Sequence, residues 1–295
     1  MSQKTYNADS ITVLKGLEPV KQRPGMYTRT EHPLHVIQEV IDNAADEAMA
    51  GFCKKIGVTL HLDGSISVSD DGRGIPVEIH PVEGVSTVEV VFTRLHAGGK
   101  FNKTDEDSAY RFSGGLHGVG VSVTNALSHR LEVEVVRDGA RHKLVFSGGD
   151  VIEPLARIGD APKKASGTSV RAWPDAKYFD APELPRAELE RLLRSKAVLM
   201  PGLEVSLAIE GGETRSWHFE HGMRGYLFEA LNDEPLIPLF AGEKFAPKGD
   251  DTFAAGEGAS WAVAWTLEGA PVRESYVNLI PTPPHGCRQP GWESG

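Results

Sequence analysis

Three hairpin signals alternate with helical segments along this chain, and this alternation limits the folds that it can adopt. Each hairpin signal is a tight dipeptide between two segments of alternating apolar and polar residues: Asp63-Gly64, Asp138-Gly139 and Gly211-Gly212. Apolar residues at helical spacing, or a leucine-spaced charged segment, predict helices at 35–51, 87–96, 121–127 and 182–199. Tight hairpins fit a doubly wound parallel sheet poorly. The pattern therefore predicts an α+β fold, with helices over one face of a mixed, largely antiparallel sheet.

The composition is that of a folded domain. The chain has 295 residues, of which 40% are hydrophobic, enough to bury a core in one large or two modest domains. We expect a cytoplasmic protein, because no apolar run reaches the roughly 18 residues of a membrane helix and the N-terminus lacks the apolar run of a signal peptide. A net charge of -10 argues against a nucleic-acid surface within this piece, since such surfaces cluster Lys and Arg.

The polar side of the helix predicted at 35–51 carries the first candidate residues. Glu39, Asn43, Asp46 and Glu47 are spaced i, i+4, i+7 and i+8, so they share one face of the helix. A solvated helix face is the simplest explanation of such a stripe. In the functional alternative, the amide oxygen of Asn43 suits magnesium. Glu39, one turn earlier, could then activate a water for attack on phosphorus.

The loop SDDGRGIP, which follows the first predicted hairpin, has two interpretations. An Asp-Gly loop after a strand is usually just a turn. Alternatively, Asp70 accepts a hydrogen bond from an amino group such as that of adenine, while Gly72 and Gly74 let a flat base approach the backbone. A further strand is predicted at 167–173, and the hydroxyl of Thr168 at its start could complete the base pocket.

A glycine-rich segment at 113–127, SGGLHGVGVSVTNAL, has the composition of a phosphate-binding loop. Its glycines would let backbone N–H groups converge on an anion at the start of the following helix. The segment is not a Walker A motif, and Val123 stands where the dinucleotide motif needs its third glycine. His117 is more typical of a structural histidine than of a catalytic base. Because the segment has no Lys or Arg, the charge of a bound triphosphate must be balanced from elsewhere.

Four features, taken in this order, resemble the ATP-binding fold of the GHKL superfamily: the helix from Glu39 to Asn43, the DDGRG loop, the glycine-rich segment and the Gly167-Thr168 pair. This superfamily includes gyrase-type topoisomerases, Hsp90, MutL and histidine kinases. Longer stretches, among them IDNAADEAMAG, LHAGGKF and ESYVNLIPT, are similar to the B subunits of bacterial type IIA topoisomerases. Within that family, WPDAKYF and SKAVLMPGLEV look more like the topoisomerase IV branch than the gyrase branch. The resemblance extends from about Tyr6 to Thr282.

The resemblance implies a division of the chain. Residues 1–220 would form a GHKL (Bergerat) ATP-binding sandwich of helices over the sheet, with an N-terminal dimerisation arm at 1–15. Residues 221–283 would be the start of a ribosomal-protein-S5-like transducer domain that is cut short. The tail at 284–295 does not match the family, and we expect it to be disordered.

The resemblance also implies roles for individual residues. Glu39 would be the general base, Asn43 the magnesium ligand and Asp70 the adenine-recognising carboxylate, supported by Thr168 through water. Arg73 would pair with Glu47 across the pocket mouth, and Arg137 would lie at the outer edge of the pocket, where inhibitors of the family bind. Tyr6 and Ile11 match the arm that reaches the partner protomer. The remaining ATP contacts are expected at Gly74, Ile75, Pro76, Lys100, Tyr110, Gly115, Leu116, His117, Gly118, Val119, Gly120 and Val121.

The implied activity is ATP-driven DNA strand passage by a type IIA topoisomerase, with ATP and magnesium as cofactors. Two B subunits would dimerise on ATP binding and assemble with a ParC-type A subunit, and DNA would be bound mainly through the holoenzyme. In the family, the transducer supplies a lysine to the γ-phosphate, so this chain is expected to bind ATP with little turnover. Two alternatives stay open: the ATPase region of a gyrase B protein, and an ATP-gated clamp of another GHKL protein without significant hydrolysis.

Overall fold

The structure is a computed structural model, which describes residues 14–97, 120–231, 235–247, 252, 256–269, 271–277 and 279–282. The helices are α1 (Glu18–Gln22), α2 (Leu34–Met49), α3 (Thr87–Thr93), α4 (Gly120–Ala126), α5 (Arg186–Leu199) and α6 (Gly222–Ala230), with 3-10 helices η2 (Pro24–Met26) and η3 (Ala176–Tyr178). The strands are β1 (Lys55–Leu60), β2 (Ile66–Asp70), β3 (Ser128–Arg137), β4 (Ala140–Ser147), β5 (Asp150–Asp160), β6 (Gly167–Pro174), β7 (Glu204–Ile209), β8 (Thr214–His218), β9 (Phe240–Phe245), β10 (Gly258–Val263), β11 (Tyr276–Val277) and β12 (Ile280–Pro281).

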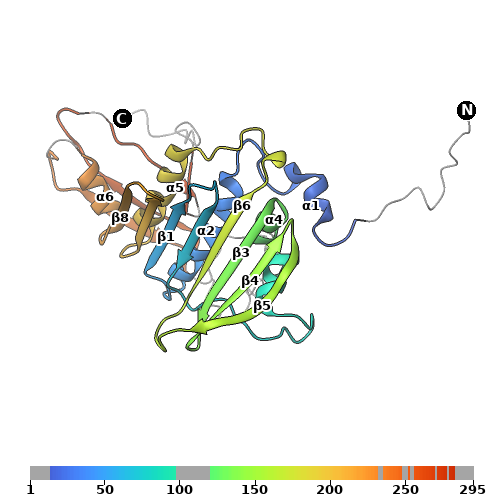
Figure 1. The fold of residues 1–295 in the computed structure, drawn as a ribbon. Coiled ribbons are helices and arrows are strands. Elements are labelled where there is room, and N and C mark those ends of the chain that lie inside the picture. The colour runs from blue at the N-terminus through green and yellow to red at the C-terminus, as the bar shows by residue number, and fades with distance from the viewer. Residues whose placement is uncertain are drawn as a thin grey trace, which may run out of the picture.

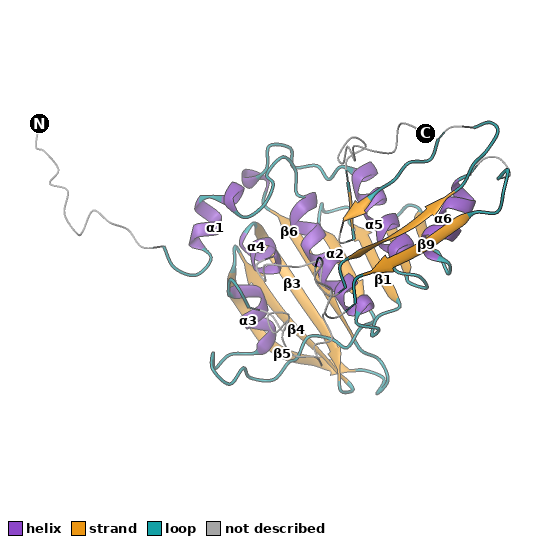
Figure 2. Ribbon diagram, turned by 180° about the vertical axis from the view of Figure 1, so that it is seen from behind, coloured by secondary structure: helices purple, strands orange, loops and turns teal. Residues whose placement is uncertain are grey.

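Strands β1 to β8 form one mixed sheet in the order β5-β4-β3-β6-β2-β1-β7-β8. Only the β1–β7 pair within this sheet is parallel, and its other neighbours are antiparallel. The sheet stands in front of α2 and α4 in Figure 1, whereas the view from behind in Figure 2 has the helices in front of the strands. The predicted fold class, helices over one face of a mixed and largely antiparallel sheet, is confirmed.

The core lies between this sheet and the helices. Alternate residues of the central strands point toward α2, α3, α4 and α5, because side chains of a strand alternate between its two faces. Helix α2 contributes Ile37 and Ile41, and α3 contributes Phe92, each at most 1% exposed. The hydroxyl of Thr124 in α4 donates to the backbone oxygen of Val36 at 2.7 Å, which fixes α4 against the start of α2.

The three hairpins form where the dipeptides predicted them, as β1–β2, β3–β4 and β7–β8. Helix α3 ends at Thr93, three residues earlier than predicted, because Arg94 has extended backbone angles. Strand β5 was not predicted. It is an edge strand with an exposed outer surface, an internal Pro154 and an irregular register against β4, and edge strands tolerate proline where central strands do not.

The described residues between 222 and 282 form smaller elements beside the main sheet (Figure 1). Helix α6 packs on α5, and the described strands of this region pair as β9 with β10 and β11 with β12. The hairpin formed by β11 and β12 lies against α5. The domain boundaries predicted at 220 and 283 stay predictions.

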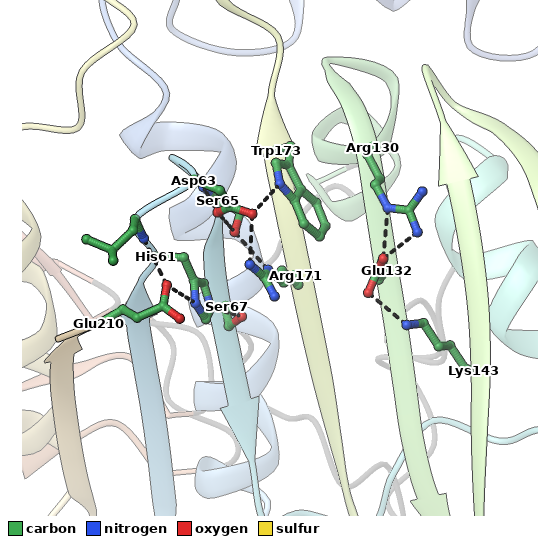
Figure 3. A network of polar contacts seen from close by, with 11 residues as sticks. His61, Asp63, Ser65, Ser67, Arg130, Glu132, Lys143, Arg171, Trp173 and Glu210 are labelled. Atoms are coloured by element: carbon green, nitrogen blue, oxygen red, sulfur yellow. Dashed lines mark hydrogen bonds and ion pairs between the residues drawn. The ribbon is translucent and has the colours of Figure 1, made fainter. Parts of the chain in front are cut away.

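The face of the sheet opposite the helices carries polar side chains (Figure 3). The carboxylate of Glu132 accepts from Arg130 at 2.8 Å and pairs with Lys143 at 2.9 Å. Farther along the sheet, Asp63 pairs with Arg171 at 2.9 Å and accepts from the indole of Trp173 at 3.1 Å. This side of the sheet therefore resembles a solvated protein surface, with its charges paired.

Candidate functional site

The candidate site begins where β2 ends beside β6. The register pairs Ser69 with Ser169, so the next step along the two antiparallel strands brings Asp70 beside Thr168. The Oδ1 atom of Asp70 accepts from the backbone N–H of Gly72 at 2.9 Å and from that of Thr168 at 3.3 Å. Its Oδ2 atom accepts no hydrogen bond from the described residues. The carboxylate is thus held in a fixed orientation with one oxygen available to a ligand.

Burial raises the pKa of Asp70 to about 6. The two backbone N–H groups act in the opposite direction, and the nearby charges of Glu47 and Asp71 raise the pKa further. A carboxyl group with this pKa is ionised at pH 7 and so accepts hydrogen bonds there. Asp70 is suited to recognise an amino group.

The loop after Asp70 folds back onto the ends of β3 and β6, and two of its contacts require glycine. A Cβ atom on Gly167 (φ +149°) would lie 2.1 Å from the backbone oxygen of Asp70. One on Gly74 (φ +75°) would lie 2.8 Å from the backbone oxygen of Val136. Arg137 then donates to the Gly74 oxygen at 2.9 Å. These close approaches hold the loop backbone directly against the ends of β3 and β6.

Further contacts stabilise the loop after Asp70. The N–H of Ile75 donates to the hydroxyl of Thr168 at 3.3 Å. The predicted pair of Arg73 with Glu47 is present, with Nε to Oε2 at 3.0 Å and Nη2 to Oε1 at 2.8 Å. The Arg73 guanidinium also lies 3.9 Å from the centre of the Phe52 ring. The bidentate ion pair with Glu47, together with stacking on the Phe52 ring, fixes Arg73 in one position.

Glu39 lies where α2 meets the first residue of α4. A Cβ atom on Gly120 would be 1.9 Å from Oε2 of Glu39, so the carboxylate occupies the space that a side chain at position 120 would fill. The solvated-face explanation of α2 is wrong: Asp46 is 1% exposed, and Glu39, Asn43 and Glu47 are half-buried. The polar stripe of α2 is therefore largely buried, with Glu39 beside the start of α4.

Comparison with known proteins decides the family. A family model described as histidine kinase-, DNA gyrase B- and HSP90-like ATPase matches residues 28–177, which span α2, the Asp70 loop, α4 and β6. The chain belongs to this ATPase family. It is 50% identical to the B subunit of DNA topoisomerase 4 from Pseudomonas aeruginosa over 99% of the chain and 45% of that protein. The chain thus spans about half the length of the curated relatives that it matches.

Solved structures agree with this family. The topoisomerase IV ATP-binding domain of Francisella tularensis, in complex with a small-molecule inhibitor, matches with a TM-score of 0.70 and 44% identity over 92% of this chain and 69% of that chain. The 43K ATPase domain of Thermus thermophilus gyrase B, in complex with an aminocoumarin, matches with a TM-score of 0.68 and 36% identity over 79% of this chain and 60% of that chain. The predicted resemblance to type IIA B subunits, with topoisomerase IV ahead of gyrase, is confirmed.

A magnesium site in this ATPase-family domain would have few protein ligands. Asn43 lies one helical turn from both Glu39 and Glu47, on the polar side of α2. The described residues contain no cluster of three or more His, Cys, Asp or Glu side chains that could hold a metal. The amide oxygen of Asn43 is a donor that fits magnesium, which is commonly bound by one or two protein oxygens together with substrate phosphates and waters.

Several predicted contacts lie outside the described residues: Tyr6, Ile11, Lys100, Tyr110, Gly115, Leu116, His117, Gly118 and Val119. Of the others, Val121 is buried in α4 and Pro76 continues the Asp70 loop. Sequence reasoning missed Asp71, whose Oδ1 accepts from the N–H groups of Lys54 and Lys55 at 2.7 and 2.9 Å. The two consecutive Asp residues after a strand were the only sequence signal for Asp71.

Among the described helices, none has the length and apolar character that a membrane crossing requires.

Proposed function

We propose that this chain is the ATP-binding region of a topoisomerase IV-type B subunit, which uses ATP binding and hydrolysis to drive DNA strand passage. The single observation that carries the proposal is the Asp70 carboxylate, fixed by two backbone N–H groups beside a loop whose close packing depends on glycine. The 50% identity of the chain to a topoisomerase 4 B subunit, over nearly its whole length, supports the same activity. The parent enzyme would decatenate and relax DNA.

The residues would divide the work as follows. The Oδ2 oxygen of Asp70 accepts a hydrogen bond from the adenine amino group, and Thr168 supports this contact through water. The backbone of Gly115 to Val121 wraps the phosphates, with help from Lys100, Tyr110 and, from a second protomer, Tyr6. Asn43 holds magnesium, which when bound neutralises phosphate charge.

Glu39 would act as the general base. Its half-buried carboxylate faces the start of α4, a position from which it can orient a water and take its proton during attack on phosphorus. In the family, the transducer supplies a lysine to the γ-phosphate, and full turnover would need this residue as well as Glu39. ATP binding would bring two B subunits together in a complex with a ParC-type A subunit, and DNA would contact mainly the holoenzyme.

Calorimetric titration with a non-hydrolysable ATP analogue tests the site. Loss of a hydrogen bond to a charged group removes about 1.5–3 kcal/mol, so Asp70→Ala should weaken binding by roughly tenfold to a hundredfold. Ser69→Ala is the matched control, because Ser69 precedes Asp70 and is exposed on the opposite face of β2. Equal affinity of wild type and Asp70→Ala would refute the adenine assignment.

A gyrase-type B subunit is the second candidate, supported by the similarity to the gyrase B ATPase domain of Thermus thermophilus. The two enzymes differ in whether the holoenzyme decatenates DNA or introduces negative supercoils. A reconstituted holoenzyme containing the full-length B subunit would be assayed for both activities. Decatenation without ATP-dependent negative supercoiling supports the topoisomerase IV assignment, and negative supercoiling supports gyrase.

A further inference from the structure

A buried ion pair between two residues without an assigned role joins α2 to α5. Nζ of Lys196 lies 2.5 Å from Oδ1 of Asp42, and the two side chains are 0% and 6% exposed. Gln38 also donates to Oδ2 of Asp42 at 3.4 Å. Asp42 directly precedes Asn43 in α2. The pair therefore ties α5 to the part of α2 that carries the candidate magnesium ligand.

The same ammonium group also holds the β11–β12 hairpin. Nζ of Lys196 donates to the backbone oxygen of Leu279 at 3.0 Å. Leu279 has a φ of +67°, a left-handed conformation that is unfavourable for a branched side chain and persists where surrounding contacts enforce it. One buried charge thus contacts both α2 and a strained turn that lies 83 residues farther along the chain.

Stability alone gives a weak reason for this arrangement. Removing two charges from water is costly, and well-packed apolar residues of similar volume often stabilise a fold as well as a buried pair does. A buried pair does fix the relative position of the elements that it joins, since its short contacts tolerate little displacement. The hydrogen bond to Leu279 extends that constraint to the hairpin.

We propose that Lys196 is a positioning residue that couples the nucleotide-binding helix α2 to the β11–β12 hairpin. Nucleotide bound beside Glu39 and Asn43 restricts the motion of α2 and therefore of Asp42. Because Lys196 contacts both Asp42 and Leu279, the motion of Leu279 is restricted as well. This inference rests on the proposed function, because it takes ATP as the ligand. The hairpin then becomes more ordered whenever the nucleotide site is filled.

Hydrogen exchange of the full 295-residue chain tests the proposal. Peptides covering residues 274–282 are followed with and without a saturating non-hydrolysable ATP analogue and magnesium, and binding is measured separately by calorimetry. In wild type, the analogue should slow exchange in the hairpin about fivefold or more, the lower end of typical coupling between sites. In Asp42→Leu/Lys196→Met, where apolar residues replace both charges, the analogue should still bind but should leave hairpin exchange unchanged.

Arg191→Gln is the matched control. Arg191 also lies on α5 and donates to the backbone oxygen of Thr282 at 2.8 Å, and within the described residues it makes no ion pair with α2. This variant should keep the nucleotide response of the hairpin. An unchanged response in the double variant would overturn the proposal, as would a wild-type chain that binds the analogue without a change in the hairpin. If the double variant fails to fold, the wild-type measurement still tests whether nucleotide binding slows exchange in the hairpin. Failure of wild type to bind the analogue would instead refute the proposed function, and this inference with it.

Discussion

The two faces of the eight-stranded sheet are built from alternate residues of the same strands, yet they do different work. In β3, Leu131, Val133 and Val135 point to the helices and are 0% exposed. Glu132 and Glu134 point the other way and pair with Lys143 and Arg141. The first face forms the hydrophobic core, and the second is a polar surface in contact with solvent.

The candidate site lies at the rim of the helix-covered face. Asp70 is on the same side of β2 as buried Ile66 and Val68, and burial is the main reason that its pKa rises. On the open face, by contrast, hydrogen bonds from Ser65 hold the pKa of the Asp63 carboxyl below its usual range. The pKa of the Asp70 carboxyl is therefore raised because Asp70 shares the buried side of the sheet with apolar residues.

The largest expected effect comes from the core side of β3. Leu131→Ala should lower the free energy of unfolding by about 3 kcal/mol, because it removes a fully buried side chain and leaves a cavity. Urea unfolding measures the change. A loss below about 1 kcal/mol would mean that the helices do not pack on this face as described.

Gly167→Ala should have the next largest effect. The new Cβ would lie 2.1 Å from the backbone oxygen of Asp70, so the loop or β6 must move, at a cost of about 2 kcal/mol. Nucleotide affinity should fall as well, since Asp70 and Thr168 shift apart. Gly211→Ala is the control: its φ is +74° but no atom lies within 4 Å of the added Cβ, so it should cost only about 1 kcal/mol and leave binding intact.

Asp70→Asn should separate stability from binding. The folded pKa of about 6 lies above the ordinary value of 3.8, so the native state binds the proton more tightly, and this group destabilises the fold as pH rises from about 4 to 6. Asparagine carries no charge, so the variant should be more stable than wild type by about 1–2 kcal/mol at pH 7. It should show no such gain below pH 4.

Unfolding curves at pH 7 and below pH 4 check the stability effect, and titration with the ATP analogue checks binding. The affinity for the analogue should drop. The NH₂ group of asparagine would face the adenine amino group, and two hydrogen-bond donors cannot bond to each other. Wild-type affinity should itself weaken as pH falls through about 6. Nucleotide binding that is equally strong at pH 5 and pH 8 would contradict an ionised Asp70 in the complex.

The smallest expected effect belongs to the open face. Glu132→Gln removes the pairs with Arg130 and Lys143, whose side chains are 39% and 28% exposed. Ion pairs at a solvated surface contribute little, so unfolding free energy should change by less than about 1 kcal/mol, and the change should shrink further at high salt. A loss as large as that of Leu131→Ala would remove the distinction between the two faces.

Much of this arrangement could be predicted from local sequence. The three glycine-containing turns specified the hairpins, and the spacing of Glu39, Asn43 and Glu47 specified one helix face. Sequence could not predict β5, whose exposed residues and Pro154 lack the alternation of a half-buried strand. It also gave no sign that Lys196 meets Asp42, because that contact depends on how α5 packs against α2. The roles of individual site residues remain predictions.

The most direct test of the site is a structure of this chain with a non-hydrolysable ATP analogue and magnesium. We predict that the adenine amino group lies at hydrogen-bond distance, about 3 Å, from the Oδ2 atom of Asp70. The triphosphate should lie between α2 and the start of α4. A nucleotide bound on the open face, or one whose base lies away from Asp70, would contradict this assignment.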